Sequence, residues 1–136
     1  MTINNPDLFV AGLWDWGFLE PCFRGTRIRP SDIDGVTEHN GHTLFIETKS
    51  PGVTVPQGQA IMFKAWQRDG NTIFVIWGHA NRAEKIQIYW PTGGGVTPIM
   101  DCDNAALASY VSRWFAYAHK SPKYKNGRSE LESSAR

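Results

Sequence analysis

The length, composition and charge of the chain are those of one folded domain. Of its 136 residues, 41% are hydrophobic and 20% are charged, which supports a buried core and excludes a disordered protein. No apolar run approaches the ~20 residues that a membrane span needs, so we expect no membrane partner. The start lacks the pattern of a signal peptide, and two cysteines do not make a disulfide framework. We therefore expect a cytoplasmic protein, and the net charge of +1 requires any nucleic-acid-binding surface to be local.

The first third of the chain predicts a short helix and then a β-hairpin. Residues 7–19 carry apolar side chains at helical spacing, and Pro21 would end that helix. Residues 22–30 become alternating after a glycine and could enter a strand. Asn40–Gly41 then separates two alternating segments, "DIDGVTE" and "HTLFIETK". Asn-Gly in this position is the strongest short-range hairpin signal.

The rest of the chain predicts two helices and two further strands. Residues 57–69 form a helix that begins near Pro56, and residues 72–78 are an apolar run expected to be a central strand buried on both faces. Residues 85–90 alternate as a strand, and a last helix begins at Asp101 or Asp103. We therefore predict a mixed α/β fold.

The chain shows no internal repeat and no signal for a second domain. We predict one domain over residues 1–119 and a polar, mobile tail over residues 120–136. Its histidines are not expected to form a metal site, because His39 and His42 would flank the turn in solvent and the other two fall in unrelated segments.

The register of the hairpin brings acidic residues together. With Asn40–Gly41 as a two-residue loop, Asp34 faces Glu47 and Asp32 faces Lys49, and the alternation of side chains places both pairs on one face. Opposed like charges destabilise a strand pair. A divalent cation would remove this conflict, and two carboxylates, a backbone carbonyl and several waters suit Mg²⁺.

Lys49 would lie beside such a cation. There its ammonium could position or help deprotonate an attacking water, or balance charge that develops on a phosphate. The alternative is a surface hairpin in which Lys49 pairs with Asp32 while Glu47 is solvated.

The stretch "IDGVTEHNGHTLFIETK" resembles the PD-(D/E)XK nuclease superfamily, in which an Asp on one strand is followed by Glu-x-Lys on the next. Asp34 precedes Glu47 by thirteen residues, as in archaeal-type Holliday-junction resolvases. The following "SPGVTVPQGQAIMFKAW" is similar to the loop and helix of VRR-NUC and resolvase-like members. The resemblance covers residues 20–77 and implies a restriction-endonuclease-like fold, a mixed central β-sheet flanked by helices.

The resemblance also implies a role for individual residues. Asp34 and Glu47 would be metal ligands together with the backbone carbonyl of Thr48, and Lys49 would be the catalytic lysine. A glutamine near the start of the helix would lie close to the site. Gln59 matches it best and Gln57 is the second choice.

Two further acidic positions are left open by the resemblance. Relatives place a Glu on the first helix, for which Glu20 is the candidate and Asp15 its competitor. The proline of the family motif is not adjacent to Asp34 here, since Pro30 precedes Asp32 by two residues. Asp32 could therefore share the metal role.

The resulting hypothesis is a Mg²⁺-dependent DNA endonuclease in which Mn²⁺ could substitute. A small member of this superfamily that lacks a sequence-reading module is expected to recognise DNA by its structure, such as junctions, flaps or single strands. Branched DNA and the likeness to resolvases imply a homodimer. The alternatives are a noncatalytic nucleic-acid-binding module on a nuclease-like fold and, third, a structural interaction protein.

Overall fold

The computed structural model describes residues 12–91 and 93–124. The chain divides into two compact units, residues 1–32 and 33–136. The second unit contains the sheet and both α-helices, and each unit is described by itself below.

The first unit carries a 3₁₀-helix, η1 (Gly17–Phe23), in its described part. The predicted helix over residues 7–19 is wrong where it can be compared: residues 12–16 are not helical, and η1 runs through Pro21. Trp16 has a φ of 64°, and the Asp15 carboxylate accepts a hydrogen bond from the backbone N–H of Gly17 at 2.9 Å. This turn prevents one continuous helix from crossing it. No strand forms over residues 22–30.

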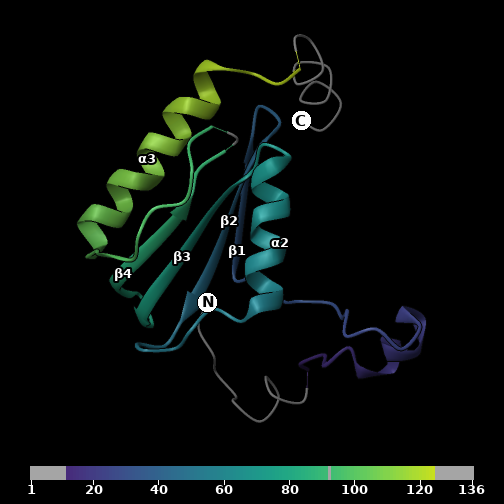
Figure 1. Ribbon diagram of the computed structural model, residues 1–136. Helices are drawn as coiled ribbons and strands as arrows, with labels where there is room; N and C mark the ends of the chain where they lie inside the picture. The colour runs from purple at the N-terminus through teal and green to yellow at the C-terminus, as the bar shows by residue number, and fades with distance from the viewer. Residues whose placement is uncertain (1–11, 92, 125–136) are drawn as a thin grey trace. The chain divides into compact units, whose positions relative to one another are not determined.

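The second unit is a five-stranded mixed sheet with a helix on each face (Figure 1). Its spatial order follows the chain: β1 (Gly35–His39), β2 (His42–Lys49), β3 (Thr72–His79), β4 (Arg82–Tyr89) and β5 (Met100–Asp101). Strands β2 and β3 are parallel, and the other neighbours are antiparallel. The predicted α/β class, a mixed sheet flanked by helices, is confirmed.

The two helices are α2 (Gln57–Arg68) and α3 (Asn104–Lys120). Both were predicted, and Asp103 is the N-cap of α3, its carboxylate accepting from the backbone N–H of Ala106 at 2.8 Å. Within the ranges that the structure describes, no helix has the length and apolar character needed to cross a membrane.

Strand β3 is the centre of the core, as its apolar run predicted. Its odd-numbered residues, such as Val75 and Trp77, pack with Phe63 of α2. Phe74, on the other face, packs in the cluster that includes Trp114 of α3. The sheet therefore separates an α2 face from an α3 face.

The β1–β2 hairpin has the predicted register, from His39 opposite His42 to Gly35 opposite Ile46. Asn40 and its following glycine both have positive φ, 54° and 83°, as a type I′ turn requires.

The ladder ends at Gly35, so the two predicted charged pairs lie outside it. Asp34 precedes the strand, and its direct opposition to Glu47 is not formed. Asp32 belongs to the first unit, where its Oδ1 accepts a hydrogen bond from Nε1 of Trp16 at 3.1 Å. Register counting was therefore correct within the strands but was extended three residues too far, to Asp32.

The prediction that the turn histidines lie in solvent is wrong. His42 is 4% exposed, and its Nε2 donates to the carbonyl of Ser121 at 2.5 Å. His39 shares a hydrogen bond with His119, with 2.9 Å between Nε2 and Nδ1. The end of α3 packs against the hairpin tip and covers these rings.

Asn40 completes the connection between the hairpin tip and the end of α3. Its side-chain amide donates to the carbonyls of Ala118 and His119 at 3.2 and 3.3 Å. Its own carbonyl accepts from the backbone N–H of Lys123 at 2.9 Å. Carbonyls in the last turn of a helix have no intrahelical partner, so one asparagine satisfies two of them while it forms the turn.

Candidate functional site

Strand β2 places Glu47 and Lys49 next to each other. Side chains alternate along a strand, so both project from the α2 face, the face on which Phe45 packs. Nζ of Lys49 lies 3.8 Å from Oε1 of Glu47, and the two side chains are only 14% and 11% exposed. An acid and an amine are thus held together in a site that is largely shielded from water.

Asp34 reaches the same segment from the other side of the hairpin. Its Oδ2 accepts two hydrogen bonds from Thr48, one from the backbone N–H at 2.8 Å and one from Oγ1 at 3.0 Å. Thr48 is the residue between Glu47 and Lys49. The structure therefore brings the predicted aspartate to the middle of the predicted Glu-x-Lys segment.

The backbone of Thr48 faces the aspartate as well. The N–H and the carbonyl of one strand residue point toward the same edge, so the Thr48 carbonyl lies on the edge of β2 that faces Asp34. The Thr48 hydroxyl projects from the α3 face, opposite to Glu47. Asp34 is thus held at the edge of β2 and does not lie over Glu47, as the predicted pairing had implied.

The role of the Thr48 side chain was missed by the sequence analysis, which assigned only its carbonyl. The sequence shows a hydroxyl at Thr48, but its contact with Asp34 depends on where β1 begins. Because its hydroxyl and N–H both bind Oδ2, Thr48 orients the carboxylate and leaves Oδ1 as the oxygen for another ligand.

Helix α2 supplies Gln59 to the same face of the sheet. Trp66, two helical turns later, stacks on Phe45 at 4.2 Å between ring centroids, so this side of α2 covers β2. Oε1 of Gln59 is buried and has no hydrogen-bond partner among the described residues. A buried carbonyl oxygen in this state is a candidate ligand for water or a cation. Gln57 is exposed, which favours Gln59.

The remaining sequence candidates all belong to the first unit. Glu20 is exposed on η1, Asp15 accepts from the backbone of Gly17, and Asp32 accepts from Trp16. In the sheet unit the contacts join Asp34 to Thr48 and Glu47 to Lys49, and a role for the carboxylates of the first unit stays a prediction.

The donor atoms of the site fit Mg²⁺ by their chemistry. Over residues 12–91 and 93–124, no group of three or more His, Cys, Asp or Glu side chains could hold a metal ion. Mg²⁺ does not need such a group, since it is commonly bound through one or two carboxylates and keeps several waters. Asp34, Glu47 and the Thr48 carbonyl are all oxygen donors, so these residues suit a partly hydrated Mg²⁺.

A cavity of about 810 Å³ borders the site. Thr48 and Lys49 form part of its lining, and it extends to the β3–β4 turn at Asn81 and to Asn104 at the start of α3. Both ends of the Asn104 amide hold this turn, with Oδ1 accepting from Ala83 at 2.8 Å and Nδ2 donating to Asn81 at 2.8 Å. Ile46 and Ile76, which also line the cavity, pack in the cluster on the α3 face, so the cavity lies on the face of the sheet opposite to Glu47.

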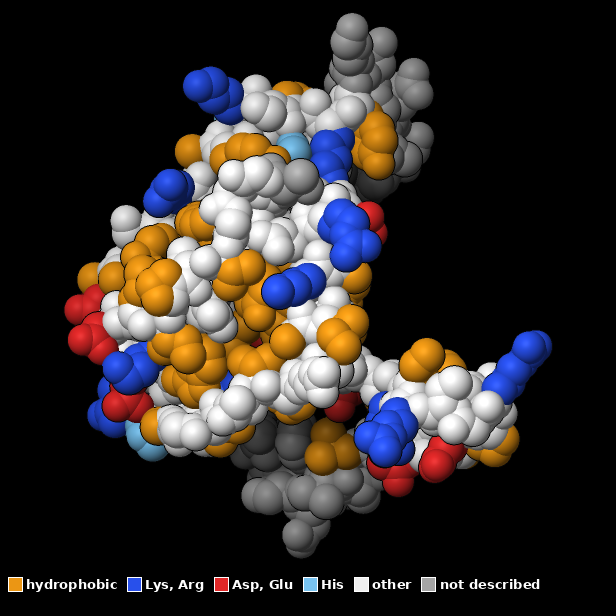
Figure 2. Space-filling view, viewed as in Figure 1, with side chains coloured by type: hydrophobic (Ala, Val, Ile, Leu, Met, Phe, Trp, Pro, Cys, Tyr) orange, Lys and Arg blue, Asp and Glu red, His pale blue; other side chains and the backbone are white. Residues whose placement is uncertain are grey.

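Positive charge is spread over the surface of the sheet unit. On the face shown in Figure 2, lysine and arginine side chains stand singly or in small groups and form no continuous basic stripe. This distribution agrees with the near-zero net charge. Any contact with nucleic acid on this face would be confined to a small area.

Comparison with known proteins gives no family assignment. No protein-family model matches the chain, and neither the curated proteins nor the solved structures give a significant match.

Proposed function

We propose that the protein is a Mg²⁺-dependent DNA endonuclease that hydrolyses phosphodiester bonds and selects DNA by structure. The observation that carries this proposal is the binding of the Asp34 carboxylate to the peptide between Glu47 and Lys49. This contact joins the three residues of the Asp…Glu-x-Lys pattern, although they come from different segments of the hairpin.

The residues of the site would have two roles: some would bind the metal ion, and Lys49 would act on the water or the phosphate. Asp34 and Glu47, with the Thr48 carbonyl, would hold Mg²⁺, which when bound lowers the pKa of water and polarises the phosphate. Lys49 would orient the attacking water or stabilise negative charge on the phosphate oxygens. Gln59 would accept a hydrogen bond from a water molecule through its buried Oε1.

The substrate class and the assembly rest on the resemblance. A junction, a flap or a single strand would be the preferred DNA, and a homodimer would present two sites to a branched substrate. Mn²⁺ would replace Mg²⁺, and the place of action would be the cytoplasm.

A cleavage assay tests the activity itself. Purified protein is incubated with linear duplex, single-stranded, flap and four-way DNA, each with Mg²⁺ or with EDTA. We expect Mg²⁺-dependent cleavage of at least one structured or single-stranded substrate and faster cleavage of it than of linear duplex. If none of the four DNA substrates is cleaved with either Mg²⁺ or Mn²⁺, the proposed nuclease activity is rejected.

The second candidate is a noncatalytic nucleic-acid-binding module. One observation favours it: both hydrogen bonds from Thr48 to Asp34 are also what a purely structural carboxylate would make to extend the hairpin beyond its last paired residues. In that case Asp34 would stabilise the strand end and would bind no metal.

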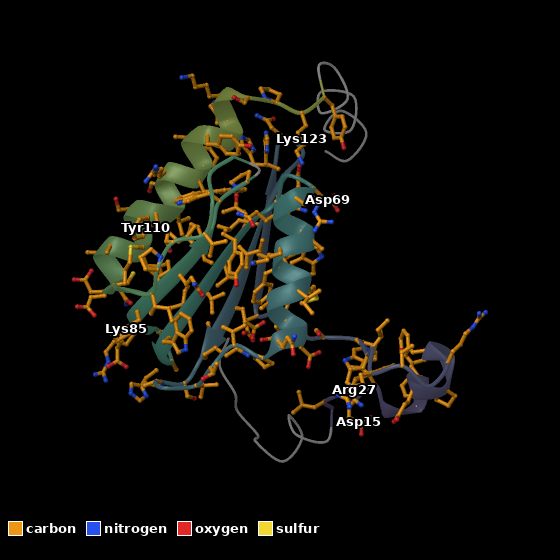
Figure 3. The ribbon with its side chains drawn as sticks, in the orientation of Figure 1. Asp15, Arg27, Asp69, Lys85, Tyr110 and Lys123 are labelled. Atoms are coloured by element: carbon orange, nitrogen blue, oxygen red, sulfur yellow. The ribbon has the colours of Figure 1, made fainter. Side chains whose placement is uncertain are left out.

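Thermal unfolding in Mg²⁺ separates the two candidates. At a Mg²⁺ concentration ten times its Kd, binding adds about 1.4 kcal/mol to the free energy of unfolding, which raises Tm by a few degrees. Asp34→Asn should reduce this gain. Asp69→Asn, at the distant end of α2 (Figure 3), is the matched control and should keep it. An unchanged Tm in the wild type would favour the binding module.

A further inference from the structure

A second groove, of about 500 Å³, lies on the α2 side of the sheet. Val53 and Val55 line it from the loop before α2, and Ile99 lines it from the segment before β5. Trp77 and Tyr89 line it from β3 and β4 but are only 5% and 4% exposed. Val53 and Ile99 are 45% and 53% exposed, so the rim of the groove is open as well as apolar.

The groove is one strand away from the candidate site. Lys49 is the register partner of Trp77, and Trp77 is in turn the partner of Lys85. Adjacent strands are about 4.8 Å apart, so Trp77 stands between the Glu47–Lys49 pair and the groove. A strand of nucleic acid with a phosphate at Lys49 could therefore place a neighbouring base in this groove.

The walls of the groove are held in place by hydrogen bonds. Nε1 of Trp77 donates to the carbonyl of Val53 at 2.6 Å, which fixes the indole against the loop. Nε2 of Gln87, which also lines the groove, donates to the carbonyl of Thr97 at 3.1 Å. Burial raises the pKa of Tyr89, so its ring stays neutral.

The charge of the groove favours an uncharged occupant. Glu84 and Lys85 are the charged residues among its lining, and their opposite signs cancel. A phosphate would gain little from such a pair, whereas a nucleobase offers apolar faces to the exposed Val53 and Ile99 side chains and a polar edge to Gln87.

We propose that this groove binds one unpaired nucleobase of the strand whose phosphate lies at Lys49. The proposal rests on the proposed function and makes it more specific, because a base can enter the groove only where it is not paired. Flaps and single strands next to the cut would then be preferred to fully paired duplex.

Filling the groove tests the proposal from the protein side. Ala60 of α2 lines the groove, and Ala60→Phe would occupy the space of the base. Ala65, on the exposed side of the same helix, gives the matched control Ala65→Phe. Binding of a fluorescent single-stranded oligonucleotide is measured in Ca²⁺, with Tm recorded for both variants. We expect Ala60→Phe to weaken binding about tenfold and Ala65→Phe to bind like wild type.

Removing the base tests it from the ligand side. Oligonucleotides with one abasic nucleotide, placed at successive positions, should bind the wild type about tenfold more weakly at a single position. In Ala60→Phe that loss should disappear, because two changes at one contact are not additive. If Ala60→Phe does not fold, the wild-type series decides alone: a loss confined to one position supports the groove, and a uniform series overturns it.

These experiments distinguish a failure of the groove from a failure of the proposed function. A wild type that binds and cleaves DNA while Ala60→Phe matches Ala65→Phe overturns the groove alone, as do additive losses in the combined series. A change of oligomeric state in Ala60→Phe, seen by sedimentation with oligonucleotide binding intact, would assign the groove to a protein contact and also overturn it. A wild type that binds no nucleic acid removes the proposed function and the groove together.

Discussion

Glu47→Gln is expected to lose metal-dependent cleavage, by about 10²–10³-fold or more. Glutamine keeps the shape of the side chain but carries no charge, so it is a poor ligand for Mg²⁺. The substitution also removes the acidic partner 3.8 Å from the Lys49 ammonium. Because that lysine is largely shielded, we expect a loss of roughly 1–3 kcal/mol in the free energy of unfolding.

A double variant separates the loss of chemistry from the loss of stability. Glu47→Gln combined with Lys49→Met should recover much of the stability, because no uncompensated charge remains, and should still not cleave. Asp69→Asn, which changes an exposed carboxylate at the far end of α2, should cleave like wild type. Cleavage at the wild-type rate by Glu47→Gln, or by the double variant, would remove these residues from the site.

Thr48→Val is expected to lower cleavage about 10–100-fold, the range found when a group that orients a metal ligand is removed. Valine matches threonine in shape but cannot donate to Oδ2 of Asp34, which then keeps only the bond from the backbone N–H. The Asp34 carboxylate would then be less firmly oriented, although the substitution removes none of the proposed ligand atoms.

The concentration of Mg²⁺ that gives half-maximal cleavage distinguishes positioning from a merely structural role. It should rise in Thr48→Val and return toward the wild-type value in Thr48→Ser, which restores the hydroxyl. A Thr48→Val variant with the wild-type rate and the wild-type Mg²⁺ dependence would show that the hydroxyl does not orient Asp34 for function.

Local signals in the sequence predicted most of the sheet unit. Asn40–Gly41 specifies a type I′ turn, and that turn defines the pairing from His39 back to Gly35. Two other predictions were correct for the same reason: the strand over residues 72–78 and the N-cap at Asp103. Each depends on neighbours in the chain. Strand β5 was not predicted because two residues are too few to show alternation.

The errors came from contacts between distant segments. The burial of His42 depends on the end of α3, about eighty positions later in the chain, and no pattern near the turn indicates it. The sequence predicted that Asp34 lies near the segment with Glu47 and Lys49 but gave the wrong contact: Asp34 meets Thr48 and does not oppose Glu47, because β1 begins one residue after the aspartate. Register alone cannot indicate where a strand stops pairing.

The attachment of the hairpin tip to the end of α3 has a consequence for the order of folding. The partners of His39, Asn40 and His42 lie at residues 118–123, so they are synthesised long after the hairpin itself. During translation β1 can pair with β2, but its tip stays unanchored until that last segment has emerged. The first hairpin of the sheet is therefore completed by the last helix, and in a nascent chain that stopped before it β1, an edge strand of the sheet, would lack this anchor.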